Sequence, residues 1–299
     1  MQKKLKTVYS VGGLGNQLFV WAFALWLQNS TASRVLMSTA FLPQSSGKHN
    51  SFAAALPFTS SSIKYSNSAF QSYIARIGLR IGNKSTAGQL SPRVSKWMRL
   101  TKFIEVGFCG DYQFSLDGNR HQYVGYFQTY KYFDSLGITG ESILEGVEAG
   151  DVKVSPSSVA IHIRHGDYRN QNQEFGILPI EYYLAGIREQ IKHGYVSHIK
   201  IFGLFDSDSL GLVRELERSF PDIEFDLECL EKPQPPHVEL KMLAQFPRQV
   251  ISNSSYSWWG ASLAPDGLKV APGSWFRGMA EPLDLIPTTW IRVPFAWRD

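Results

Sequence analysis

The chain has 299 residues, of which 43% are hydrophobic and 13% aromatic, and its formal net charge is +4. This composition supports a sizeable core and excludes disordered, collagen-like and low-complexity chains. The two cysteines, Cys109 and Cys229, match no zinc or redox spacing, which favours a reducing compartment.

The positive charge is concentrated in the first third of the chain. Residues 1–104 contain thirteen Lys and Arg and no Asp or Glu, a formal +13, whereas the remainder carries 17 basic and 26 acidic residues. This asymmetry favours an anionic partner for the first part, such as nucleotide phosphates, a membrane surface or nucleic acid. A solvated basic face that binds nothing specific is the alternative.

The N-terminal segment predicts a strand, a glycine turn and a helix. Residues 5–11 fit a short strand, residues 12–15 read GGLG, and residues 16–28 place apolar side chains at helical spacing. Such a unit directs backbone N–H groups and a helix dipole at an anion. The pattern is neither a Rossmann fingerprint nor a P-loop, so a plain strand–helix turn remains the alternative.

The same segment bears on membranes and targeting. The apolar run 18–27 is too short to span a bilayer, which needs about 20 residues. No signal-peptide cleavage site follows it, so we predict no targeting segment and a cytoplasmic protein.

The rest of the first half predicts a less regular succession of elements. We expect strands at 34–37, 103–108 and 122–126, a loop over 43–68, short basic helices within 69–102, a weak helix at 143–147 and a linker at 149–156. The domains are therefore predicted as 1–150 and 151–299.

The second half contains the clearest strand. Val159, Ile161 and Ile163 alternate with polar or small residues, and the strand ends at His165-Gly166-Asp167. Arg164 then lies at the carboxyl end, where open α/β sheets bind ligands. Its planar fork of donors suits phosphate, although an ion pair with Asp167 is an equally plain interpretation.

Strands and helices alternate after that point. The pattern predicts helices at 180–192, 210–219, 237–246 and after 255, with strands at 198–205, 223–225 and 249–252. This alternation favours a parallel, doubly wound α/β sheet.

Two polar segments follow predicted strands. Ser252 to Ser255 provides hydroxyls and helix N-terminal N–H groups for an anion, or an ordinary helix cap. Asp206-Ser207-Asp208 resembles the Asp-x-Asp metal site of some sugar transferases, or a helix cap.

Three motifs together carry a family resemblance. GGLGNQLF at 12–19, HIRHGDY at 162–168 and SNSSYSWWGA at 252–261 resemble the motifs of the bacterial α-1,2-fucosyltransferase family, and GYFQ at 125–128 supports them. The resemblance implies a GT-B-like fold of two facing Rossmann-type domains with the active site in the cleft between them. It also implies GDP-β-L-fucose as donor, inversion at C1, and neither metal nor other cofactor. The first domain would serve the acceptor and the second would bind GDP-fucose.

The motifs also imply residue roles. Arg164, Asp167 and Asn16 are the expected catalytic residues, with His165 and Glu174 as further candidates for the general base. The expected substrate-binding residues are Gly13, Gly15, Gln17, His162, His165, Glu239, Asn253, Ser254 and Ser255. The chain departs from the family at His165, where a second Arg is usual, and at Glu239, Phe246 and Arg248.

The function predicted in this way is transfer of L-fucose to a hydroxyl of a glycan, galactose O2, in synthesis of a bacterial surface polysaccharide such as O-antigen or capsule. A free or a lipid-linked glycan fits as acceptor. Contact with the anionic inner membrane is expected, and contact with nucleic acid is not. Two alternatives remain: a metal-dependent hexosyltransferase that uses Asp206 and Asp208, and a non-catalytic nucleotide- or carbohydrate-binding protein. Retention of both Arg164 and Asn16 disfavours the latter.

Overall fold

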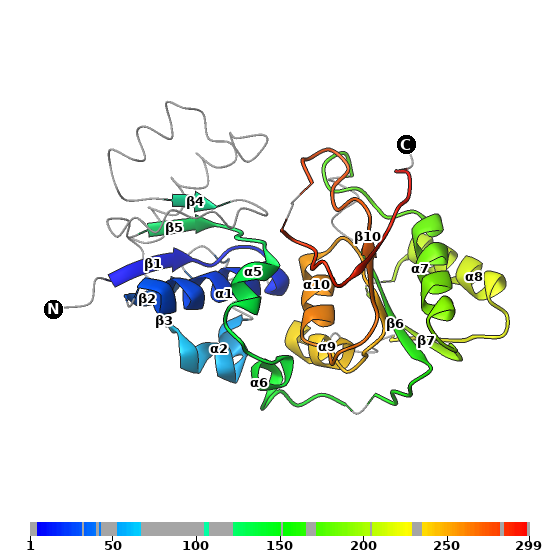
Figure 1. Cartoon of the computed structure of the whole chain (residues 1–299), viewed down its shortest axis with the longest axis horizontal. Helices are drawn as coiled ribbons and strands as arrows, with labels where there is room; N and C mark the ends of the chain where they lie inside the picture. The colour runs from blue at the N-terminus through cyan, green and yellow to red at the C-terminus, as the bar shows by residue number, and fades with distance from the viewer. Residues whose placement is uncertain are drawn as a thin grey trace. The chain divides into compact units, whose positions relative to one another are not determined.

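In the computed structural model, the described residues are 5–31, 33–39, 42, 53–66, 105–107, 122–150, 152–165, 172–203, 205–228, 235–281 and 284–297. The chain forms two compact units, Met1–Val147 with Pro282–Ile286 and Glu148–Glu281 with Pro287–Asp299. Each unit contains one parallel sheet with helices (Figure 1), which confirms the predicted α/β class with two such domains. The short helices predicted within 69–102 lie outside the described residues, as does Asp167.

The first unit contains a five-stranded sheet in the order β3-β2-β1-β5-β4, and all its pairs are parallel. Its strands are β1 (Leu5–Tyr9), β2 (Arg34–Ser38), β3 (Lys64–Ser66), β4 (Glu105–Gly107) and β5 (Gln122–Gly125). Its helices are α1 (Leu14–Thr31), α2 (Pro57–Ser62), α5 (Tyr130–Asp134) and α6 (Gly140–Leu144), with a 3-10 turn η1 at Ala53–Ala55.

Helix α1 forms much of the core of this unit. Apolar residues lie on all its sides, so it is buried nearly all round. The ring of Phe23 stacks on Phe127 at 3.9 Å between centroids and meets Tyr123 edge-on at 5.6 Å. Tyr123 lies in β5 and Phe127 follows it, so these contacts fix α1 against the middle of the sheet.

Two predictions for the first unit were wrong. The segment 43–68 was expected to be a loop, yet it contains η1, α2 and β3. Pro57 begins α2 at a position where its missing N–H costs nothing, and Lys64 to Ser66 pair with β2. The weak helix expected at 143–147 lies earlier, at Gly140–Leu144, because Thr139 caps its N-terminus by accepting from Ser142 N.

The second unit contains a six-stranded sheet in the order β11-β10-β9-β6-β7-β8, again with parallel pairs. Its strands are β6 (Ser158–Ile163), β7 (His198–Gly203), β8 (Glu224–Leu227), β9 (Gln249–Val250), β10 (Lys269–Pro272) and β11 (Ile291–Val293). Its helices are α7 (Ile180–Lys192), α8 (Ser207–Ser219), α9 (Pro236–Leu243) and α10 (Ser255–Ser262). Strands β10 and β11 were not predicted.

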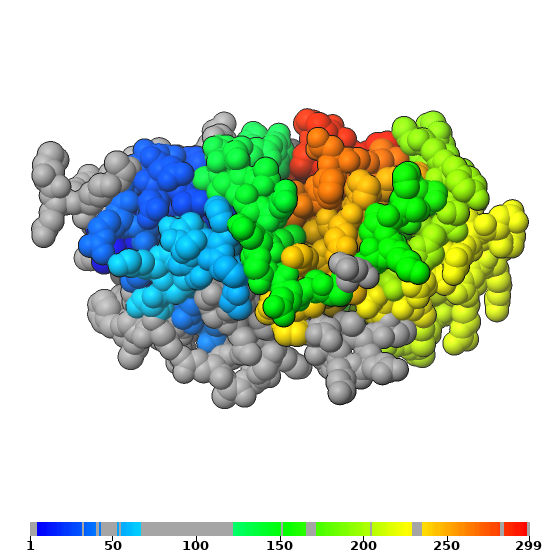
Figure 2. Space-filling view, turned by 90° about the horizontal axis from the view of Figure 1, so that it is seen from below, coloured from blue at the N-terminus to red at the C-terminus, as the bar shows by residue number. Residues whose placement is uncertain are grey.

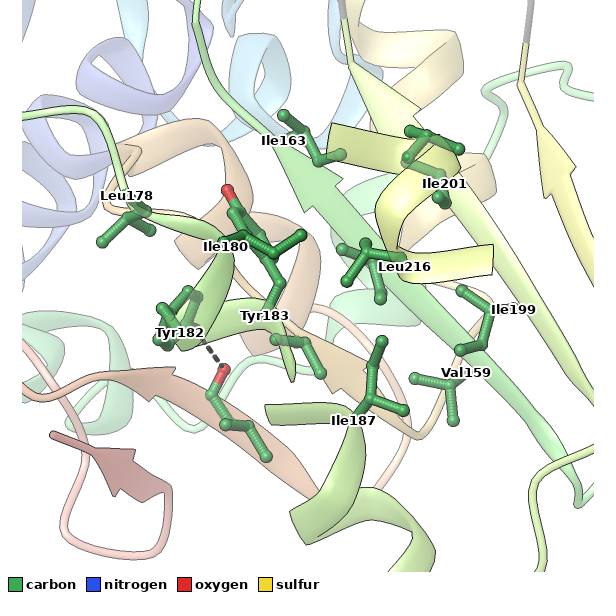
Figure 3. Packing of buried hydrophobic residues seen from close by; sticks show 14 of the residues in the cluster. Val159, Ile163, Leu178, Ile180, Tyr182, Tyr183, Ile187, Ile199, Ile201 and Leu216 are labelled. Atoms are coloured by element: carbon green, nitrogen blue, oxygen red, sulfur yellow. Dashed lines mark hydrogen bonds between the residues drawn. The ribbon is translucent and has the colours of Figure 1, made fainter. Parts of the chain in front are cut away.

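Helices cover both faces of this sheet, with α7 and α8 on one side and α9 and α10 on the other (Figure 1). Figure 3 shows the first side, where the apolar residues of β6 and β7 face those of α7 and α8: Val159, Ile163, Ile199, Ile201, Ile187 and Leu216. On this side Tyr182 also donates its hydroxyl hydrogen to the carbonyl of Ile251. The outer face of α8, yellow in Figure 2, is exposed and charged.

The side chains of β6 alternate between these two layers. Val159, Ile161 and Ile163 pack against α7 and α8, whereas Ala160 packs with Leu243 and Phe246 on the α9 side. The period of two therefore turns His162, and Arg164 after it, toward α9 and α10.

Each sheet has one point where the strand order reverses direction. In the second unit it lies between β6 and β9, and in the first unit it lies between β1 and β5. Ligands of open α/β sheets bind beyond the carboxyl ends of the strands at such a point. Within the described residues, none of the helices combines the length and apolar character that a membrane span requires.

Candidate active site

The carboxyl ends of β6 and β9 are joined by His162. Its Nδ1 lies 2.9 Å from Ser252 Oγ, and its ring centroid lies 5.6 Å from that of Tyr256. His162 is buried, and this burial, with the positive charge of Arg164 second, lowers its pKa to about 3. The imidazole is therefore neutral at pH 7, with one nitrogen donating and the other accepting.

Arg164 lies one residue beyond β6 and is partly buried. Its charge lowers the pKa of His162 and opposes the rise in the pKa of Glu239 and of Tyr256. A charge shifts the pKa of a neighbouring group in this way when the two groups lie within a few ångströms of each other. The structure thus brings Arg164, just beyond β6, close to α9, which carries Glu239, and to α10, which carries Tyr256.

Among the side chains around Arg164, Glu239 is the one whose pKa lies near neutrality. Burial is the main cause that raises its pKa from 4.5 to about 7, and the negative charge of Glu228 raises it further, while Arg164 lowers it. A carboxyl with a pKa near neutrality, next to an arginine at a switch point, is typical of a functional site.

The turn after β9 leads into α10. Ser254 is the N-cap residue and is buried, but its side chain makes no capping hydrogen bond, whereas Ser255 begins the helix and is partly exposed. Tyr256 donates its hydroxyl hydrogen to the carbonyl of Pro236 at 2.8 Å, which ties α10 to the start of α9. This is the strand-to-helix turn predicted as an anion site.

Asn253 has a structural role at this turn. It was expected to bind substrate, but its side chain is buried and Nδ2 donates to the carbonyls of Phe175, Gly176 and Trp275, at 2.9, 3.1 and 3.2 Å. Its amide nitrogen therefore holds two loops in place at the carboxyl end of the sheet.

His165 and Asp206 lie at the ends of neighbouring strands, with His165 Nδ1 3.9 Å from Asp206 Oδ1. Asp206 caps α8, because its Oδ1 accepts from the backbone N–H of Asp208 and of Ser209. The helix-cap interpretation of Asp206-Ser207-Asp208 is thus confirmed. Among the residues that the structure describes, no group of three or more His, Cys, Asp or Glu is placed to hold a metal ion.

Glu174, the outside candidate for a base, is exposed on a turn before α7. Its backbone carbonyl accepts from the N–H groups of Arg277 and Gly278, at 3.2 and 3.1 Å. These bonds tie its turn to the segment that follows β10.

The first unit has its own cluster at the β1–β5 switch point. Gly12 has φ +72, a conformation that favours glycine, and Gly13 accepts from Gln17 N at the start of α1. Gly15 is buried within the helix, whereas Gly13 and Asn16 are partly exposed. Gln128, three residues beyond β5, donates to Asn16 Oδ1 at 2.7 Å.

Gln17 also has a structural role. It was expected to bind substrate, but it is fully buried. Its Nε2 donates to the carbonyl of Gly12, and its Oε1 accepts from Ala53 N. Both ends of the amide thus hold the glycine turn to η1.

Sequence reasoning did not assign roles to Gln128, Tyr256 or Glu228. The first two lie inside the segments GYFQ and SNSSYSWWGA, so their membership of the motifs is the signal that could have found them. No sequence signal pointed to Glu228, because its effect on the pKa of Glu239 depends on how the end of β8 and helix α9 pack.

The chain is similar to known sugar transferases. It matches the family described as Glycosyl transferase family 11 over residues 6–281. It is 26% identical to an Escherichia coli alpha-1,2-colitosyltransferase over 216 residues, 65% of this chain and 73% of that protein. It is 27% identical to the E. coli O-antigen biosynthesis glycosyltransferase WbnK over 135 residues, 41% of this chain and 40% of that protein.

A crystal structure of NodZ alpha-1,6-fucosyltransferase soaked with GDP-fucose matches with a TM-score of 0.42 and 12% identity, covering 88% of this chain and 94% of that one. The family match spans most of the sequence and includes all three motifs, which confirms the resemblance predicted from them. The chain belongs to glycosyl transferase family 11.

Proposed function

We propose that this glycosyltransferase moves L-fucose from GDP-β-L-fucose to a glycan hydroxyl, galactose O2, with inversion at C1. The observation that carries the proposal is Arg164, at the carboxyl end of β6 beside the β6–β9 switch point. A guanidinium can hold a diphosphate through two parallel hydrogen bonds. Those bonds strengthen as GDP departs with its negative charge, which is where stabilisation raises the rate.

The surroundings of Arg164 support a nucleotide in this place. His162 is neutral and offers a hydrogen bond without adding charge, and the start of α10 offers backbone N–H groups near Ser254 and Ser255. Contact between His162 and the guanosine is implied by the family resemblance. No metal or other cofactor is part of the proposal, because Arg164 and the N–H groups would meet the phosphate charge.

The donor sugar has one rival. The relative named alpha-1,2-colitosyltransferase favours the same α-1,2 linkage but a different sugar, since colitose lacks a hydroxyl that fucose carries. Nucleotide-activated colitose is therefore the second candidate donor.

The biological setting is proposed from the relatives and from charge. The relative WbnK, named for O-antigen biosynthesis, supports a surface-polysaccharide acceptor, free or lipid-linked. A cytoplasmic location is part of the proposal. The formal +13 of residues 1–104 exceeds what one diphosphate needs, so we also propose peripheral contact with the anionic inner membrane. Residues 1–150 would then form the acceptor-side domain and residues 151–299 the donor-binding domain.

Inversion needs a group that takes the proton of the acceptor hydroxyl. Asp167, His165 and Glu174 are the candidates. A variant that lacks the true base loses transfer but keeps its affinity for the donor. A variant that lacks a residue orienting Arg164 loses both. The dissociation constant of the donor and kcat of Asp167→Asn, His165→Ala and Glu174→Gln therefore separate the roles.

The test of the function is a screen of GDP- and UDP-sugars, including GDP-fucose and GDP-colitose, for protection of the native chain against thermal unfolding. We expect protection by GDP-fucose, little by UDP-sugars, and slow release of GDP from GDP-fucose without acceptor. Binding without any release of GDP, with or without acceptor glycans, would favour the non-catalytic alternative.

A further inference from the structure

Gln128 and Asn16 form a pair across the β1–β5 switch point. Gln128 Nε2 donates to Asn16 Oδ1 at 2.7 Å, although the two residues are 112 positions apart. Gln128 is buried, and Asn16 is partly exposed on the first turn of α1. The bond therefore joins an interior side chain to one that a ligand can reach.

This bond selects one of the two orientations of the Asn16 amide. An amide has an acceptor oxygen on one side and two N–H donors on the other, so engaging Oδ1 turns Nδ2 away from Gln128. Nδ2 then lies over the glycine turn, since a Cβ built on Gly12 would be 2.5 Å from it. No described residue accepts a hydrogen bond from this Nδ2.

The backbone before Gln128 is held in an uncommon conformation. Phe127 has φ +50, in the left-handed region that a bulky side chain rarely adopts. Its ring is stacked on Phe23 of α1 with 6° between the planes, and its carbonyl accepts from Thr129 N at 3.0 Å. Thr129 in turn caps α5 by accepting from Lys131 N. These contacts fix the turn that carries Gln128 against the helix that carries Asn16.

We propose that Gln128 is a positioning residue that holds the Asn16 amide with its N–H donors toward the glycine turn, where they donate to a phosphate or sugar oxygen of the substrate. The inference rests on the proposed function, in which Asn16 contacts substrate. In the flipped orientation Oδ1 would face the same oxygen, and two acceptors repel. Gln128 thus determines whether Asn16 attracts or repels the substrate at this place.

The experiment compares Gln128→Glu with Gln128→Met. Glu has the size of Gln, but its carboxylate only accepts, so it takes a bond from Asn16 Nδ2 and flips the amide. The Asn16 N–H then no longer donates to the charged substrate oxygen, and loss of such a hydrogen bond lowers kcat by about 10- to 100-fold. Met fixes neither orientation, so about half of the molecules remain competent and kcat falls by about twofold.

Gln122→Glu is the matched control. Gln122 lies on β5, the strand that precedes Gln128, and its Oε1 accepts from the Tyr9 hydroxyl at 2.7 Å, a bond that a carboxylate can also accept. This variant adds the same charge without touching Asn16, so transfer is expected to stay at the wild-type rate. Thermal unfolding of all three variants shows separately what each substitution does to stability.

A second measurement does not depend on catalysis. In the wild type, the side-chain amide protons of Asn16 should give a nuclear Overhauser effect to the α-protons of Gly12, and Gln128→Glu should abolish it. An unchanged effect in Gln128→Glu, or equal kcat losses in the Glu and Met variants, would overturn the positioning role. A wild type with the expected effect but no transfer from any nucleotide sugar would instead refute the proposed function.

Discussion

Replacing Glu239 with Gln removes a carboxyl whose charge the folded protein disfavours. Its pKa rises from 4.5 to about 7, mainly through burial. Between these two pH values the folded chain holds a proton that the unfolded chain releases, so the free energy of unfolding falls as the pH rises through this window. The shift corresponds to about 3 kcal/mol, or about 1–3 kcal/mol once screening of the partly exposed carboxyl is allowed for.

Glu239→Gln should therefore be more stable than the wild type by about 1–3 kcal/mol at pH 8 and nearly equal to it at pH 4. Urea unfolding at both pH values measures this, with Glu217→Gln, an exposed carboxyl of α8, as the control that gains nothing. Affinity for GDP-fucose should fall in Glu239→Gln, because functional sites keep groups that destabilise the fold. Equal stability of Glu239→Gln and wild type at pH 8 would refute the reasoning.

Three further outcomes follow from the site and the charge pattern. Arg164→Ala should lower kcat by about 10²–10³-fold, and Arg164→Lys should restore little, since Lys lacks the fork; near-normal turnover of the Lys variant would contradict bidentate binding. Excess EDTA should leave the transfer rate almost unchanged, whereas a loss restored by Mn²⁺ or Mg²⁺ would make Asp206 and Asp208 metal ligands. Cosedimentation with anionic vesicles should weaken as salt rises, and equal recovery with neutral vesicles would refute membrane contact. It should also weaken when basic residues of the first third are neutralised: Arg76, Arg80, Arg93, Lys96 and Arg99.

The local patterns in the sequence were enough to predict the elements that carry the site. The alternation of Val159, Ile161 and Ile163 gave β6 its correct place, because a buried strand between two helical layers requires apolar residues on one face. The apolar run after the glycine turn predicted α1 for a similar reason. Strand β11 could not be predicted, since it is a three-residue strand at the edge of the sheet without strong alternation.

The roles of individual amides could not be predicted in the same way. Gln17 and Asn16 are neighbours in one motif, yet helical geometry turns Gln17 into the core and leaves Asn16 partly exposed. Asn253 lies in a polar run, but its partners are three carbonyls brought together by loops distant in sequence. Motifs identify where a site is, whereas tertiary packing decides which of its polar groups remain available.

The return of residues 282–286 to the first unit has a practical consequence for anyone dividing the chain. Asp284 accepts from Tyr130 N through its carbonyl and pairs with Lys131 through its carboxylate at 2.8 Å, so α5 is stabilised by a segment more than a hundred residues downstream. A single cut near residue 147 would remove that support from the N-terminal fragment. Independent expression of the first unit therefore calls for a fusion that restores residues 282–286 beside α5 through an engineered linker.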